Sequence, residues 1–176
     1  NELLSTYIDY IKYKYTEKST FVHISGELEH AERYLIFQKK KTGDRLEYSI
    51  QVPKELHMQK MPSDILMPFI QNAFYNGIML EKEGGEITVT GYMHSGNMFL
   101  EINDTGPGLT EEELDIKYEA YKDKHEGYYI KMGMEYAKEK MKRLFGKEYG
   151  IITENYRNKG SKSILLWPEH YEERTE

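Results

Sequence analysis

The order of helical and strand patterns is the feature that most constrains how this chain can fold. Alternating apolar residues predict strands at 46–52, 86–93 and 98–103, the last two joined by a turn at 94–97, and a final hairpin turning at 157–160. Apolar residues at helical spacing predict helices at 2–15, 25–40, 64–77 and 134–145. Because regular strand–helix–strand crossovers are missing, these patterns indicate an α+β sandwich rather than a Rossmann-type sheet.

Two of the predicted helices have candidate N-terminal caps. Ser25 or Gly26 is expected to begin the helix that runs to about residue 40, and Ser63 or Asp64 the helix that carries Asn72. The second helix has an apolar stripe made of Leu66, Phe69, Ile70, Ala73 and Gly77. We expect Asn72 on the flank of that stripe, beside Asn76 one turn later.

A set of polar and glycine residues on this framework suggests an ATP site. Asn72 can offer a carbonyl oxygen to Mg²⁺, a cation that takes oxygen ligands and bridges nucleotide phosphates. Asp104, at the end of a predicted strand, can accept a hydrogen bond from an exocyclic amine, and Gly106 and Gly108 let the backbone approach a flat base. Gly133 is expected to open a helix whose first amides face a phosphate.

The composition agrees with one folded domain. The chain has 176 residues, enough to bury a core, and it has no Cys, which excludes disulfides and suits a reducing compartment. Its net charge of −6 argues against nonspecific nucleic-acid binding. No apolar run reaches the roughly 20 residues that cross a bilayer, and no signal peptide is visible.

Residues 110–132 are rich in polar residues, Lys and Tyr, and contain Gly127. We interpret this segment as a mobile lid that contains one helical turn. Lys122, Lys124 and Lys131 could reach phosphates, whereas the alternative is that they are simply solvated.

The order of these motifs resembles the GHKL (Bergerat) ATP-binding fold, and within it the catalytic domains of YesM/LytS-type sensor histidine kinases. MPFIQNA at 67–73, followed by Gly77, resembles the N box of that family, and NDTGPGL at 103–109 resembles its G1 box. Gly133 with EKMKRLFG at 139–146 resembles the G2 region. Segments 27–36, 43–47 and 159–168 resemble the start and the closing strand, so the resemblance covers about residues 20–168.

This resemblance implies a two-layer α/β sandwich with a mixed, mostly antiparallel sheet packed on helices. It implies that Asn72 holds Mg²⁺, that Asp104 selects adenine, and that Ser161 supports the base through a water, as the Thr of the family does. Asn76, Gly106, Gly108 and Gly133 complete the expected binding residues for ATP. The implied activity is that of a histidine kinase, which presents the γ-phosphate of ATP to a histidine on a separate helix.

The resemblance also implies an organisation into two parts and a set of partners. Residues 1–20 are expected to end a dimerisation helical region, and residues 21–176 to form the catalytic domain. The expected partners are the histidine-bearing helices of a homodimer and a downstream response regulator. The expected location is the cytoplasmic side of a membrane-bound sensor, with membrane contact only through upstream segments. The alternative for the apolar stripe of 2–15 is packing on its own domain.

None of the six histidines has the sequence context of the phosphoacceptor, so we expect the acceptor to lie in a segment outside this chain. Pro68 stands where hydrolytic relatives have a water-activating Glu, which argues against a general ATPase. Gln71, Asn76 and the single glycine in KMGM at 131–134 depart from the family pattern. Two functions therefore stay open: an active kinase domain, and a degenerate signalling module of the same fold that works through dimer contacts.

Overall fold

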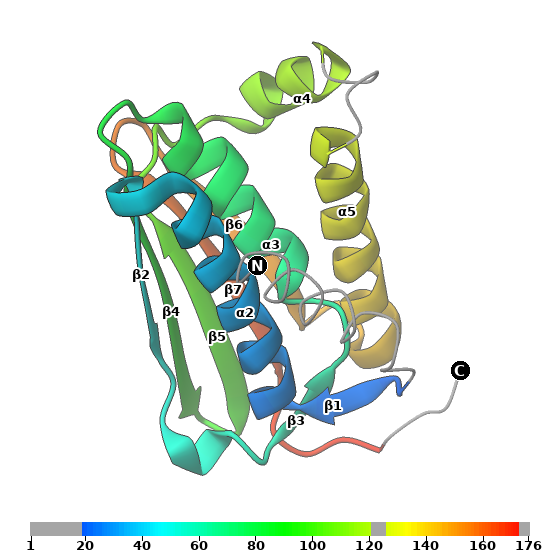
Figure 1. The fold of residues 1–176 in the computed structure, drawn as a ribbon. Coiled ribbons are helices and arrows are strands. Elements are labelled where there is room, and N and C mark those ends of the chain that lie inside the picture. The colour runs from blue at the N-terminus through cyan, green and yellow to red at the C-terminus, as the bar shows by residue number, and fades with distance from the viewer. Residues whose placement is uncertain (1–18, 121–125, 173–176) are drawn as a thin grey trace.

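A five-stranded mixed sheet forms one layer of the domain (Figure 1). The computed structural model describes residues 19–120 and 126–172, so the helix predicted at 2–15 lies outside the described residues. The strands, in spatial order, are β2 (Leu46–Gln51), β4 (Gly85–His94), β5 (Asn97–Asp104), β7 (Gly160–Pro168) and β6 (Gly150–Tyr156). β2 pairs with β4 in parallel and the other pairs are antiparallel, which confirms the predicted α+β class.

Helices form the second layer, on one face of this sheet (Figure 1). They are α2 (Ile24–Thr42), α3 (Met67–Asn72), α4 (Glu111–Ala120) and α5 (Glu126–Phe145). α3 continues directly into a π-helical turn at Ala73–Gly77 and a 3-10 turn at Ile78–Leu80. Single π-helical turns in longer helices are frequent at functional sites. Among the described residues, no helix is both long and apolar enough to cross a membrane.

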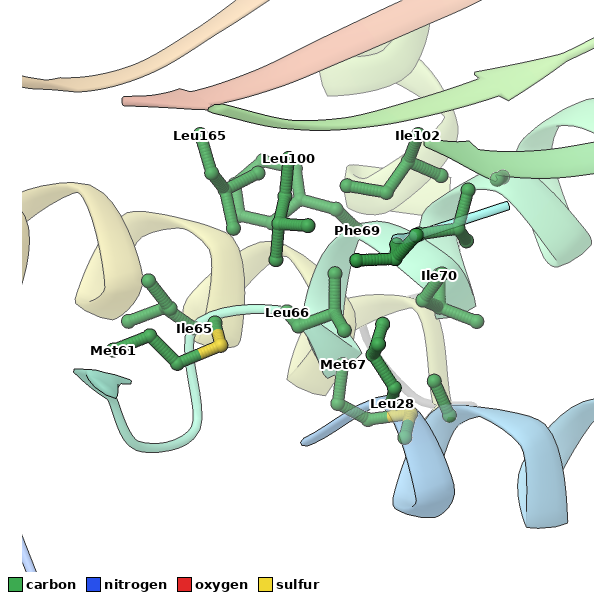
Figure 2. Close-up of a cluster of buried hydrophobic side chains, with 14 of the residues drawn as sticks. Leu28, Met61, Ile65, Leu66, Met67, Phe69, Ile70, Leu100, Ile102 and Leu165 are labelled. Carbon is green, nitrogen blue, oxygen red and sulfur yellow. The ribbon is translucent and has the colours of Figure 1, made fainter. Parts of the chain in front are cut away.

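The core lies between the sheet and the helical layer. Figure 2 shows Leu100, Ile102 and Leu165 pointing from the strands toward side chains of α3. Phe69 and Ile70 of α3 meet them and are themselves almost fully buried. Leu28 of α2 lies on the far side of α3, so α3 is packed between the sheet and α2. The predicted stripe on the Asn72 helix is therefore confirmed as core.

A small second sheet joins the start of the domain to the segment before α3. β1 (Phe21–His23) pairs antiparallel with β3 (Lys60–Pro62). Trp167 of β7 donates its indole N–H to the carbonyl of Lys60 at 3.1 Å, which ties this small sheet to the main one.

The predicted N-terminal caps are not observed. α2 begins at Ile24, and its first amides already donate to the loop carbonyls of Gln59 (2.9 Å) and His57 (3.0 Å). α3 begins after Leu66 without a side-chain cap, and Asp64 has a positive φ of 61°. A loop can satisfy helix-end donors as well as a side chain can, so no Ser or Asp is needed at either end.

The expectation of a mostly irregular lid at 110–132 is wrong. α4 occupies Glu111–Ala120, and α5 begins at Glu126. Thr110 and Glu113 form a reciprocal capping box, in which the Thr110 amide donates to the Glu113 carboxylate (2.9 Å) and the Glu113 amide to the Thr110 hydroxyl (3.2 Å). Leu114 and Tyr118, one turn apart, are the buried side chains of α4. A capping box and a two-residue apolar contact therefore suffice to form this helix in a polar segment.

Candidate functional site

Three elements bring the expected site residues together at one end of the sheet. The last residue of β5 is Asp104, β7 begins beside it with Ser161 one residue into the strand, and the α3 region supplies two asparagines. These side chains surround a cavity of about 10 Å³. It is lined by Asn72, Asn76, Gly77, Asp104, Gly108, Leu109, Leu114, Asn155 and Ser161.

Asp104 is held as a fixed hydrogen-bond acceptor inside this site. Its side chain is 6% exposed, and it accepts hydrogen bonds from the Gly106 amide (2.9 Å) and from the Ser161 hydroxyl. Burial raises the pKa of this carboxyl above its ordinary value, while the bonds from Ser161 and Gly106 oppose that rise. Ser161 and the Gly106 amide therefore fix the orientation of the carboxylate without adding a positive charge.

Glycines make room around this carboxylate. A Cβ on Gly77 would lie 2.6 Å from Asp104 Oδ1, closer than real Cβ contacts come. A Cβ on Gly106 would overlap the backbone of Gly77, so the two glycines let the G1 loop and the helix pass at backbone distance. Gly108 has a φ of 63°, the left-handed region that favours glycine. These positions explain why the loop after β5 needs its glycines.

Asn72 lies beside Asn76, as the sequence predicted, and lines the cavity. It is almost fully buried, and its Oδ1 accepts hydrogen bonds from Asn76 Nδ2 (2.8 Å) and from the Tyr118 hydroxyl (3.1 Å). The two donors fix the position of this carbonyl oxygen. An amide oxygen is a ligand that a hard cation accepts.

Comparisons with known proteins find sensor histidine kinases among the relatives of this chain. No protein-family model matches the chain. It is 27% identical over 133 residues to the sensor histidine kinase BtsS of Escherichia coli strain K12, covering 76% of this chain and 21% of BtsS. It is 22% identical over 151 residues to the sensor protein LytS of Bacillus cereus, covering 86% of this chain and 25% of LytS.

Solved structures share the fold. The catalytic domain of histidine kinase ThkA, in a nucleotide-free form, superposes with a TM-score of 0.57 at 18% identity, covering 87% of this chain and 97% of that domain. Full-length ShkA in complex with AMPPNP also has a TM-score of 0.57, at 16% identity, covering 95% of this chain and 35% of ShkA. The chain is therefore similar in sequence to LytS/BtsS-type sensor histidine kinases, and it has the fold of a histidine-kinase catalytic domain. It spans about a fifth to a quarter of the length of those curated relatives.

Gly133 does not open a helix, contrary to expectation. It lies inside α5, where a Cβ would come within 3.1 Å of Pro68 Cγ on α3. In this conformation the glycine allows close packing of α5 on α3, and it does not line the cavity. A role for Gly133 toward phosphate stays a prediction.

Of the three lysines expected to reach phosphates, one lies in the described part of the chain. Lys131 lies on α5, and its ammonium pairs with Asp115 of α4 at 2.7 Å. Lys122 and Lys124 lie outside the described residues.

Two residues of α4 that the sequence patterns did not predict for the site also reach it. The Tyr118 hydroxyl contacts both asparagines, and Lys117 Nζ donates to Asn76 Oδ1 at 2.8 Å. Asn155 of β6 also lines the cavity. The sequence contains a signal for α4, the capping-box pattern TEEE at 110–113. Nothing in the sequence, however, pairs Tyr118 with Asn76 and Asn72, which lie 42 and 46 positions away.

Proposed function

We propose that this kinase domain binds ATP with Mg²⁺ and presents the γ-phosphate to a histidine on a dimerisation helix outside the chain. One observation carries the proposal: Asn72, Asp104 and Ser161, which come from separate elements, converge on one cavity in a histidine-kinase catalytic fold. The AMPPNP complex of ShkA, which shares this fold, supports a nucleotide as the ligand.

The residues at the end of β5 suit the base of the nucleotide. Asp104 would accept a hydrogen bond from the exocyclic amine of adenine, because its carboxylate already faces the cavity in a fixed orientation. Ser161 would assist through a water. Gly77, Gly106 and Gly108 allow the close backbone packing that holds Asp104 in this position, where a flat base would meet it.

Asn72 suits the metal end of the nucleotide. Its Oδ1 is oriented by Asn76, and an amide oxygen is a ligand that Mg²⁺ accepts. Among the described residues, no group of three or more His, Cys, Asp or Glu could hold a metal ion. This fits an ion that takes few protein ligands and several phosphate oxygens and waters. When bound, the ion supplies charge neutralisation for phosphoryl transfer.

The wider organisation follows as part of the same proposal. Residues 1–20 would end the dimerisation region of a homodimer, and residues 21–176 would form the catalytic domain. The phosphorylated histidine would then donate to a response regulator, on the cytoplasmic side of a membrane-bound sensor. The printed names of the relatives, sensor histidine kinase and sensor protein, support this arrangement.

One observation favours the degenerate module as a second candidate. α5 is helical through residues 131–134, the segment that resembles the G2 region, and the cavity of about 10 Å³ is far smaller than a nucleotide. A domain fixed in this state would signal through its surfaces and not through phosphoryl transfer.

Calorimetry of ATP binding with and without Mg²⁺ tests the proposal, using the full chain and the Asn72→Ala and Asp104→Ala variants. We expect magnesium-dependent binding that weakens about 10- to 100-fold in each variant, because each loses a charged or charge-assisted interaction. Asp44→Ala, on an exposed turn, is the matched control and should bind like the wild type. Absence of binding by a folded wild-type domain, checked by far-UV circular dichroism, would leave the degenerate module.

A further inference from the structure

We propose that α4 is an autoinhibitory plug of the nucleotide site: Tyr118 and Lys117 occupy the polar groups of Asn72 and Asn76, and they must leave before ATP with Mg²⁺ can bind. This inference rests on the proposed function and adds a regulatory step to the same site. α4 lies at the end of the molecule that carries the β6–β7 turn (Figure 1), which is also the end where Asp104 completes β5.

Tyr118 bonds directly to Asn72 Oδ1, the oxygen that we propose as the metal ligand. Its hydroxyl donates to Asn72 Oδ1 at 3.1 Å and accepts from Asn76 Nδ2 at 2.8 Å, so it bonds both asparagines at once. The side chain is 6% exposed, so these bonds are shielded from water. The hydroxyl therefore occupies the oxygen that a metal ion would need.

Lys117 places a positive charge beside the same pair. Its ammonium donates to Asn76 Oδ1 at 2.8 Å and approaches the Tyr75 carbonyl at 3.5 Å. Because both acceptors are oxygens of the α3 region, the ammonium supplies there part of the charge that a bound cation would bring. A metal ion on Asn72 and the Lys117 ammonium on Asn76 would repel each other, because both are cations at close range. The two therefore cannot occupy the site together.

The volume of the site gives an independent argument. The cavity of about 10 Å³ is walled on one side by Leu114 of α4 and holds no more than about one water. A nucleotide base cannot enter while Leu114 and Tyr118 stay in place. Displacement of α4 would remove both at once, because one helical turn separates them.

The attachments of α4 outside the site are weak, so the plug can be released. Glu113 pairs with Arg157 of the β6–β7 turn at 3.1 Å, and Asp115 pairs with Lys131 of α5 at 2.7 Å. The Arg157 and Asp115 side chains are 73% and 60% exposed, and exposed ion pairs contribute little. The buried bonds of Tyr118 and the part-buried bonds of Lys117 hold α4 over the site in addition to these exposed pairs.

Tyr118→Phe tests the plug because it keeps the ring and removes the hydroxyl. Loss of the two hydrogen bonds that this hydroxyl makes should raise the affinity for ATP with Mg²⁺ at least about fivefold in calorimetry, since a larger fraction of molecules is then open. Lys117→Met should act in the same direction. Tyr136→Phe is the matched control, because Tyr136 is half-exposed on α5 and should leave affinity unchanged.

Hydrogen exchange of the α4 amides, measured without nucleotide, separates this inference from the proposed function. Faster exchange in Tyr118→Phe together with tighter ATP binding supports the plug. Equal affinity of wild type and both variants overturns the plug and leaves the proposed function intact. If neither wild type nor variants bind ATP although α4 exchanges faster in the variants, the proposed function fails and the plug as a nucleotide gate fails with it.

Discussion

The carboxyl group of Glu27 lies inside the helical layer, where burial makes its charge costly. It is 3% exposed on α2, and its Oε1 accepts a hydrogen bond from the Asp64 amide at 3.3 Å. The pKa of Glu27 is raised to about 7, chiefly by burial and also by the nearby charge of Asp64. The amides of Asp64 and Leu66 and the charge of Lys140 oppose this rise. Lys140 also donates to the carbonyl of Ser63 at 3.0 Å, so this cluster joins α2, α5 and the segment before α3.

We predict that Glu27→Gln flattens the pH dependence of stability. Between pH 4.5 and about 7 the folded protein holds a proton that the unfolded chain has released, so the free energy of unfolding falls as pH rises through this window. The shift corresponds to a loss of about 3 kcal/mol across the window, and the glutamine, which cannot ionise, should not show it. Urea unfolding at pH 5 and pH 7.5 measures the difference.

The control for this measurement is Glu55→Gln, a change at an exposed carboxylate. It should keep the wild-type slope of stability against pH. A slope unchanged by Glu27→Gln would mean that the carboxyl is hydrated in solution and that its burial does not govern its titration.

Single residues also show how far the sequence could predict the site. Asp104 and Asn72 were found because each stands at a recognisable place, a strand end and a patterned helix, whereas Ser161 followed from the family resemblance; all three line the cavity. Tyr118 and Lys117 were missed because their partners, Asn72, Asn76 and Tyr75, are more than 40 positions away. Sequence patterns describe neighbours within a few turns, and such long-range pairs depend on how elements pack.

At the scale of elements, α4 is the one whose stability depends most on its ends. It spans only ten residues, and isolated helices of that length are marginal in water. Its N-terminus is held by the capping box of Thr110 and Glu113, with Glu111 and Glu112 also in the first turn, where the helix dipole favours negative charge.

We predict that Thr110→Ala loosens α4 without unfolding the domain. Loss of a cap costs about 1 kcal/mol, which should make the α4 amides exchange roughly fivefold faster by hydrogen-exchange mass spectrometry. Amides of α2, which has no side-chain cap, serve as the internal reference and should not change. Thr110→Ser keeps the hydroxyl and should behave like the wild type. Equal exchange in all three proteins would show that packing alone holds α4.

The elements also explain where sequence prediction failed. The strands were predicted well because alternation of apolar residues is a local property that a half-buried sheet preserves. α5 was expected to start near residue 134, since Gly127 and Gly133 were taken as breaks, yet both glycines lie within Glu126–Phe145. Each glycine costs a helix about 1 kcal/mol, but burial of Ile130, Ala137 and Met141 offsets that cost.

At the scale of the whole molecule, one core connects the sheet to the helical layer. Buried residues of α2, α3, α5 and the central strands belong to a single cluster. Trp167 of β7 is part of it, is fully buried, and donates to Lys60 of the small sheet. The main sheet, the small sheet and the helices therefore share contacts that would be lost together.

We predict that the described part of the domain unfolds as one cooperative unit. Trp167 is the only tryptophan of the chain, so its fluorescence reports the sheet side of the core, whereas far-UV circular dichroism reports mainly the helices. Because both belong to one hydrophobic cluster, urea titrations followed by the two signals should give the same midpoint and the same slope. An earlier loss of helical signal, with Trp167 still in its native environment, would instead mean that the helices separate from an intact sheet. Repeating the titration with Thr110→Ala shows whether α4 alone causes such an early loss. That variant should reduce the helical signal at low urea without moving the midpoint reported by Trp167.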